Sequence, residues 1–140
     1  MSSEHERFIS EEEELRRLRE RKLAELGEKR QEMNDGPVHV TDLNFSEITK
    51  KHSLALIDFW APWCGPCRTL APTIEELTKE YVGKVFIGKL NVDENPNTAE
   101  CFQVFSIPTM LIMKNGEEVD RIVGCVHKKY IEAALRKHLG

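Results

Sequence analysis

Two cysteines separated by two residues are the feature of this sequence best suited to chemistry. They stand in the run Trp63-Cys64-Gly65-Pro66-Cys67. Thiols at this spacing lie one helical turn apart, so the second can attack a mixed disulfide that the first has formed. Pro66 stiffens the short ring that a disulfide would close, and Gly65 leaves its outer face uncrowded. The pair predicts thiol–disulfide exchange, with Cys64 as the nucleophile and Cys67 as the resolving thiol.

A zinc site is the alternative use of the same spacing, because a C-x-x-C pair also forms half of many zinc knuckles. Zinc would need two further ligands, and Cys101, Cys125 and His127 are available. They form neither a second C-x-x-C pair nor a histidine pair at zinc-finger spacing. The sequence therefore favours redox chemistry, and we expect neither a metal nor a cofactor.

The elements on either side place Cys64 at the start of a helix. Residues 54–61 are almost continuously apolar, as expected of a strand covered on both faces. Residues 65–81 then carry apolar side chains at helical spacing. A sulfur between such a strand and helix lies among free backbone N–H groups at the positive end of the helix dipole. That position favours the thiolate, which is the nucleophile in disulfide exchange.

The rest of the domain predicts alternating strands and helices. We expect strands over 38–40, 85–92, 109–114 and 118–123, and helices over 43–52, from Pro96, and over 127–139. Asn115-Gly116 joins the last two strands in a tight hairpin. The alternation implies parallel strands with crossover helices, and the hairpin adds an antiparallel edge. The predicted fold class is α/β, with a central mixed sheet and helices on both faces.

Two lone charges fall inside the predicted apolar strands, Asp58 in 54–61 and Lys89 in 85–92. Burying an unpaired carboxylate is costly, so Asp58 must be paired, neutral or in contact with water. One interpretation is a structural buried ion pair with Lys89. The other is a carboxyl group with a raised pKa that exchanges a proton with Cys67.

From residue 38 onward the sequence resembles the thioredoxin family. The resemblance rests on motifs in family order: F-W-A-P before W-C-G-P-C, then K-L-N-V-D-E-N-P, I-P-T, K-N-G and V-G. It implies the thioredoxin fold, a three-layer sandwich around a five-stranded mixed sheet, for residues 37–140. It also implies a protein-disulfide reductase that works through a reversible Cys64–Cys67 disulfide and draws electrons from a separate thioredoxin reductase.

The resemblance implies two groups of site residues. The catalytic group is Cys64, Cys67, Gly65 and Pro66, with Asp58 for proton transfer and Lys89 as its partner. The substrate-binding group is Trp63, Ile107, Pro108, Val123 and Gly124. Within it, Pro108 is expected to be cis and to face the dithiol, and the Ile107 backbone to pair with an extended substrate segment. Phe105, where many thioredoxins carry a polar residue, could add apolar surface beside this group.

An acidic and basic extension precedes the domain. Residues 1–36 read as a charged helix over 10–32 followed by a linker, and 1–35 hold 11 acidic and 8 basic residues. The helix is either simply solvated, or it docks on a partner through a stripe that includes Leu15, Leu18 and Leu26.

Composition and charge argue against two classes of partner, nucleic acids and membranes. The chain has 140 residues and a net charge of -4, which argues against nucleic-acid binding. No apolar run has the length of a membrane span or of a secretory signal. We therefore expect a cytoplasmic monomer that meets protein disulfides, with no membrane and no nucleic acid among its partners.

Overall fold

The computed structural model describes residues 14–19 and 36–140. These belong to two compact units of the chain, residues 1–34 and 35–140. Residues 14–19 are helical, and Leu15 and Leu18 are exposed. The remainder of the helix predicted over 10–32 lies outside the described residues.

Residues 36–140 form five strands and four helices in the predicted order. They are β1 (Val38–Val40), α2 (Phe45–Lys51), β2 (Leu54–Trp60), α3 (Gly65–Glu80), β3 (Phe86–Asn91), α4 (Pro96–Cys101), β4 (Thr109–Lys114), β5 (Glu117–Val123) and α5 (Lys128–His138). The observed ends of β1 and β4 are those predicted, and the ends of the other elements with predicted bounds differ by at most two residues. Helix α3 continues through Pro72.

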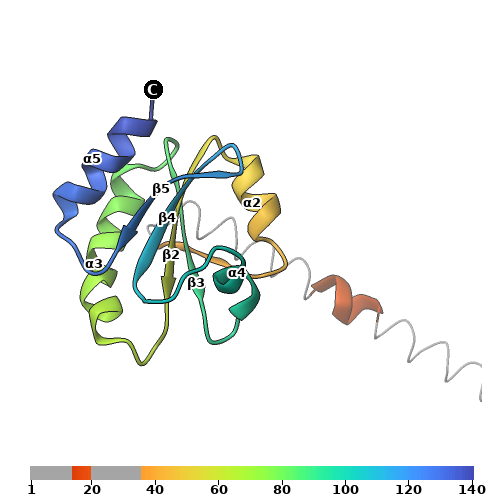
Figure 1. The fold of residues 1–140 in the computed structure, drawn as a ribbon. Helices are drawn as coiled ribbons and strands as arrows, with labels where there is room; N and C mark the ends of the chain where they lie inside the picture. The colour runs from red at the N-terminus through yellow and green to blue at the C-terminus, as the bar shows by residue number, and fades with distance from the viewer. Residues whose placement is uncertain (1–13, 20–35) are drawn as a thin grey trace, which may run out of the picture. The chain divides into compact units, whose positions relative to one another are not determined.

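The strands make one mixed sheet in the order β1-β3-β2-β4-β5 (Figure 1). Strand β2 lies at its centre, parallel to β3 and antiparallel to β4, and β4 pairs antiparallel with β5. Where β3 meets β1, a Cβ added to Gly88 would come within 2.6 Å of the Val40 side chain and 3.1 Å of the Val38 carbonyl oxygen. A larger residue here would force the Val40 side chain or one of the two strands to move. The predicted thioredoxin-type sheet is confirmed.

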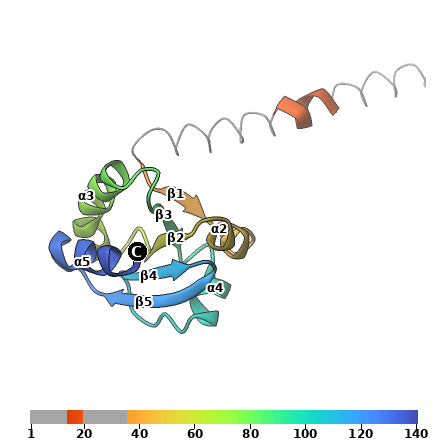
Figure 2. The ribbon, with the colours of Figure 1, turned by 90° about the horizontal axis from the view of Figure 1, so that it is seen from above.

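Helices cover both faces of the sheet, α3 and α5 on one side and α2 and α4 on the other (Figures 1 and 2). Successive side chains of β2 point to opposite faces. Leu54 and Leu56 therefore pack with α3 and α5, whereas Ile57 and Phe59 pack with α2 and α4. Burying each such side chain contributes about 1.5–3 kcal/mol to stability. The same alternation places Asp58 on the face covered by α3.

Candidate active site

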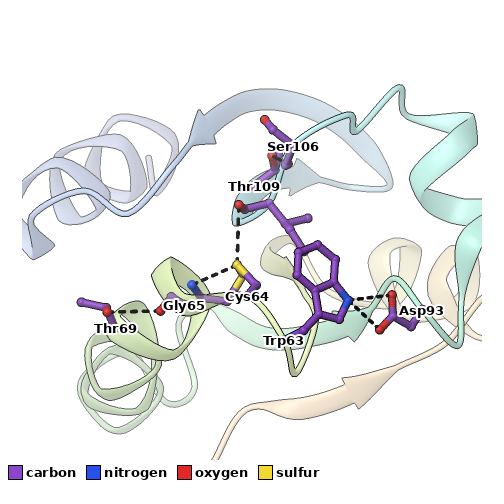
Figure 3. Close-up of a disulfide and its surroundings, with 9 residues drawn as sticks. Trp63, Cys64, Gly65, Thr69, Asp93, Ser106 and Thr109 are labelled. Carbon is purple, nitrogen blue, oxygen red and sulfur yellow. Dashed lines mark hydrogen bonds between the residues drawn. A yellow bond between two sulfur atoms is a disulfide. The ribbon is translucent and has the colours of Figure 1, made fainter.

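Cys64 and Cys67 form a disulfide with their Cα atoms 5.3 Å apart. Cys64 is the N-cap of α3, and the backbone N–H of Cys67 donates to the Cys64 Sγ at 3.2 Å (Figure 3). The sequence produces this arrangement because strand β2 ends at Trp60 and Pro66 suits the first turn of the helix. A charge-assisted hydrogen bond and the helix dipole both stabilise negative charge on Cys64 when the disulfide opens.

Exposure does not distinguish the two cysteines, since Cys64 is 4% exposed and Cys67 is 3% exposed. Their neighbours do distinguish them. The Cys64 Sγ lies 3.7 Å from the carbonyl oxygen of Ile107, in the connection that leads to β4. Cys67 instead lines a cavity that it shares with Asp58. The sulfur of Cys64 is thus the one with a polar contact, among the described residues, to the segment predicted to bind substrate.

The peptide bond between Ile107 and Pro108 is cis, as the resemblance implied. The carbonyl oxygen of Pro108 accepts a hydrogen bond from the backbone N–H of Gly124 at 2.8 Å. Gly124 has φ +95°, a conformation that side chains disfavour. This bond joins the end of β5 to the start of β4, and so brings Val123 and Gly124 beside the segment that contacts Cys64.

Trp63 presents an exposed indole ring before the nucleophile. Its Nε1–H donates to the carboxylate of Asp93, at 2.9 Å to Oδ2 and 3.2 Å to Oδ1 (Figure 3). Sequence reasoning did not select Asp93. The signal was present, because Asp93 lies two residues after the end of β3 and Trp63 three residues after the end of β2, and the carboxyl ends of parallel strands meet at one edge of a sheet.

The connection between α4 and β4 is held by Arg121, a second residue that the sequence did not single out. Its guanidinium donates to the carbonyl oxygens of Phe102 at 2.6 Å and Gln103 at 3.2 Å, and pairs with Glu118 at 2.8 Å. The connection nevertheless presents Phe105 to solvent, with 91% of the residue exposed. The backbone of this segment is thus anchored while the Phe105 ring faces solvent.

Asp58 is 5% exposed, and its Oδ1 has no hydrogen-bond partner among the described residues. Burial raises the pKa of its carboxyl group to about 7, although the positive charge of Lys89 acts in the opposite direction. Asp58 and Lys89 face each other across the parallel pair of β2 and β3. In the described part of the chain the two side chains form no ion pair, so the interpretation of Asp58 and Lys89 as a structural ion pair does not match this arrangement.

A cavity of about 100 Å³ lies between the sheet and α3. Its walls include Asp58, Trp60, Cys67, Arg68, Glu75 and Lys89. Pro37, Ala71 and Ile74 also line it, so its walls are partly apolar. The Asp58 carboxyl group and the Cys67 sulfur therefore border the same small space.

The residues considered as further zinc ligands do not lie together in the described part of the chain. Cys101 and Cys125 are exposed free thiols. Across residues 14–19 and 36–140, no three histidine, cysteine or acidic side chains lie close enough together to hold a metal ion. In the same residues, none of the helices has the length and apolarity needed to span a membrane.

Comparison with known proteins agrees with this geometry. The family model for thioredoxin matches residues 36–137. Thioredoxin 2 of Chlorobaculum tepidum is 55% identical over 101 residues, which cover 71% of this chain and 93% of that protein. Thioredoxin of Staphylococcus haemolyticus is 52% identical over 102 residues, covering 73% and 97%.

A solved structure of similar fold is that of a mutant thioredoxin from Halobacterium salinarum, with a TM-score of 0.70 and 29% identity. The match covers 76% of this chain and 93% of that one. Sequence relatives, fold and disulfide thus point the same way. The chain belongs to the thioredoxin family, and its Cys64–Cys67 pair makes it a protein thiol–disulfide oxidoreductase.

Proposed function

We propose that Cys64 is the nucleophile with which the reduced protein opens disulfides in other proteins. The observation that carries this assignment is the N–H of Cys67 donating to the Cys64 Sγ at the start of α3. The Cys64 thiolate attacks one sulfur of the substrate disulfide, and that disulfide breaks. A mixed disulfide forms, and the first substrate sulfur leaves as a thiolate that takes up a proton.

Cys67 completes the reaction as the resolving thiol. Its thiolate attacks the Cys64 sulfur, so the mixed disulfide breaks and the Cys64–Cys67 disulfide forms. The second substrate sulfur leaves and is protonated. Two electrons pass from the protein to the substrate, and the protein ends in the disulfide form seen in the structure.

Asp58 accepts the proton that Cys67 gives up. A group with a pKa of about 7 can both take and release protons near neutral pH, which is what a general base needs. The cavity that Asp58 shares with Cys67 supports this role. Lys89 is the partner whose charge adjusts Asp58, and Gly65 and Pro66 set the separation of the two sulfurs.

Substrate docks on the surface formed by Trp63, Ile107, Pro108, Val123 and Gly124. The exposed ring of Trp63 and the close approach of Ile107 to Cys64 support this surface. An extended substrate segment would pair with the Ile107 backbone beside the sulfur under attack.

A separate thioredoxin reductase restores the dithiol, since the chain carries no dinucleotide-binding motif. We place the protein in a reducing compartment, the cytoplasm, where it acts as a monomer. The exposed free thiols of Cys101 and Cys125 support that location, because such thiols persist where glutathione keeps them reduced.

Reduction of insulin disulfides by dithiothreitol tests the assignment. The wild-type protein should accelerate the reaction, and Cys64→Ser should abolish the acceleration. Cys101→Ser and Cys125→Ser are matched controls, because they remove thiols outside the disulfide, and both should retain full activity. Equal rates for wild type and Cys64→Ser would reject the proposed function.

A further inference from the structure

The ammonium group of Lys89 lies over the face of an aromatic ring. Its Nζ is 4.9 Å from the centroid of the Trp60 ring, within the range of a cation–π interaction. Trp60 and Lys89 are both half-buried and line the cavity beside Asp58. Tryptophan gives the strongest such interaction of the aromatic side chains, and removal from water strengthens it.

The strands place both possible partners of Lys89 on one face. Asp58 is opposite Lys89 in the register of β2 and β3, and Trp60 lies two residues further along β2 on the same face. The flexible lysine side chain can thus turn to the carboxyl group or to the ring. In the described residues it contacts the ring, and no hydrogen bond or ion pair joins it to Asp58.

We propose that Trp60 is a positioning residue: the face of its indole ring holds the Lys89 ammonium away from the Asp58 carboxyl group and so leaves that group able to bind and release a proton beside Cys67. This inference rests on the proton-transfer role proposed for Asp58. Cation–π contact here does not serve stability alone. It determines whether the Lys89 ammonium contacts the Trp60 ring or the Asp58 carboxyl group.

The other groups around Asp58 do not act on the charge of its carboxyl group as Lys89 does. Those that face it or Lys89 are His39 on β1, Cys67, Arg68 and Glu75 on α3, and the uncharged Met110 opposite Asp58 on β4. Arg68 and Glu75 are exposed, so water screens their charges. His39 has its pKa lowered by burial and by Lys89, which favours its neutral form. Lys89 is thus the charge that can change the state of Asp58.

If Trp60 positions Lys89, removing the Trp60 ring should shift the pKa of the Asp58 carboxyl group. An opposite charge within about 4–6 Å lowers the pKa of a carboxyl group by about 1–3 units. Removing the Trp60 ring releases Lys89 toward Asp58, and the Asp58 pKa should then fall by about one unit or more. A smaller side chain at position 60 also admits water, which lowers the same pKa without Lys89. The two causes must be separated by a double-mutant cycle.

The experiment is an NMR titration of the Asp58 carboxyl carbon in the oxidised full-length protein. It compares Trp60→Leu with wild type, and the same change in a Lys89→Met background. The fall caused by Trp60→Leu should be larger by about one pH unit when Lys89 is present. Equal falls in both backgrounds would show that the ring only excludes water, and would overturn the proposal.

Two further measurements guard against loss of the fold. Trp60→Phe keeps an aromatic face but lacks the indole N–H, and should leave the Asp58 pKa nearer to the wild-type value than to that of Trp60→Leu. In the wild-type protein the Cε protons of Lys89 should resonate upfield of those of other lysines, because of the ring current. Unshifted Lys89 protons would also overturn the proposal.

The titration uses no substrate. It can therefore fail while Cys64-dependent insulin reduction stands, and the insulin assay can fail while the titration succeeds.

Discussion

The carbonyl oxygen of Ile107 lies 3.7 Å from the Sγ of Cys64, across a separation of 43 residues in sequence. A hydrogen-bond donor, the N–H of Cys67, contacts the same sulfur at 3.2 Å. The sulfur proposed as the nucleophile therefore lies between an N–H group that would stabilise its charge and the backbone of Ile107, with which we propose that a substrate pairs. On that proposal, docking and bond exchange occur at one place.

Replacing the resolving thiol should trap the substrate. In a background where Cys101 and Cys125 are serine, Cys67→Ser should accumulate a mixed disulfide with insulin, because no second thiol can release Cys64. Cys64→Ser in the same background should accumulate little or none. Mass spectrometry under non-reducing conditions measures both. Adducts confined to Cys64→Ser would reverse the proposed roles of the two cysteines.

Asp58→Asn should flatten the dependence of stability on pH. The native carboxyl group has a pKa of about 7 against 3.8 for an ordinary aspartate, so between these values only the native state holds the proton. The contribution of Asp58 to stability is present below pH 3.8 and is lost as the pH rises through about 7. The free energy of unfolding should fall by about 1.4 kcal/mol per pH unit in that range.

Urea denaturation of the oxidised protein at pH 5 and pH 8 checks this slope. Asp58→Asn should exceed the wild type in stability at pH 8, where the wild type buries a charge. Glu75→Gln is the matched control, because Glu75 lines the same cavity but is exposed, and it should keep the wild-type slope. A wild-type slope in Asp58→Asn would show that another group causes it.

Gly124→Ala should cost about 1 kcal/mol of stability. A Cβ at this position would meet no atom within 4 Å, so the loss comes from the φ of +95° and not from crowding. Gly65→Ala is the comparison, since its Cβ would also meet nothing and its φ lies outside the positive range. It should be neutral or stabilising by about 0.5 kcal/mol. Thermal denaturation that ranks the two in the opposite order would contradict the argument.

Phe105→Ser should weaken the reaction with proteins and spare small disulfides. Losing an exposed aromatic contact of about 1 kcal/mol lowers kcat/KM for insulin by about fivefold. The rate with hydroxyethyl disulfide should not change, because so small a molecule does not reach the ring. Val82→Ser removes another exposed apolar residue. Val82 precedes β3, whereas Phe105 precedes the antiparallel β4, so the two lie at opposite ends of the strands. Equal effects from both variants would assign Phe105 no role in docking.

Removing residues 1–35 should leave the melting temperature and the rate of insulin reduction unchanged, because β1 to α5 contain every site residue. The oligomeric state, measured by sedimentation, should also stay the same. A slower reaction with the reductase or with protein substrates would instead show that the extension docks on partners. Leu15→Ser with Leu18→Ser in the full chain would then test whether the exposed leucines of residues 14–19 make that contact.

Local pattern sufficed to predict the elements and the dithiol. The continuous apolar run of β2, the Asn115-Gly116 turn and the position of Cys64 before a helix each depend on residues close in sequence. The residues implied by resemblance, above all cis Pro108, needed the family motifs, because an isoleucine before a proline does not by itself specify a cis bond.

Two contacts between distant segments were not predicted. Asp93 reaches Trp63 and Arg121 holds the backbone of Phe102 only because the sheet order brings their loops together. The orientation of the Lys89 side chain could not be predicted from the sequence either. A charge beside both a carboxyl group and an indole ring has two possible contacts, and no spacing rule decides between them.

The central place of β2 has a consequence for synthesis on the ribosome. The thiols that follow this strand are translated before Pro108 and Gly124. Until the hairpin of β4 and β5 emerges, the nascent chain carries both thiols without the surface proposed to bind substrate, and one side of β2 has no neighbour. Docking of that hairpin therefore covers an open strand and completes the proposed substrate surface in a single event.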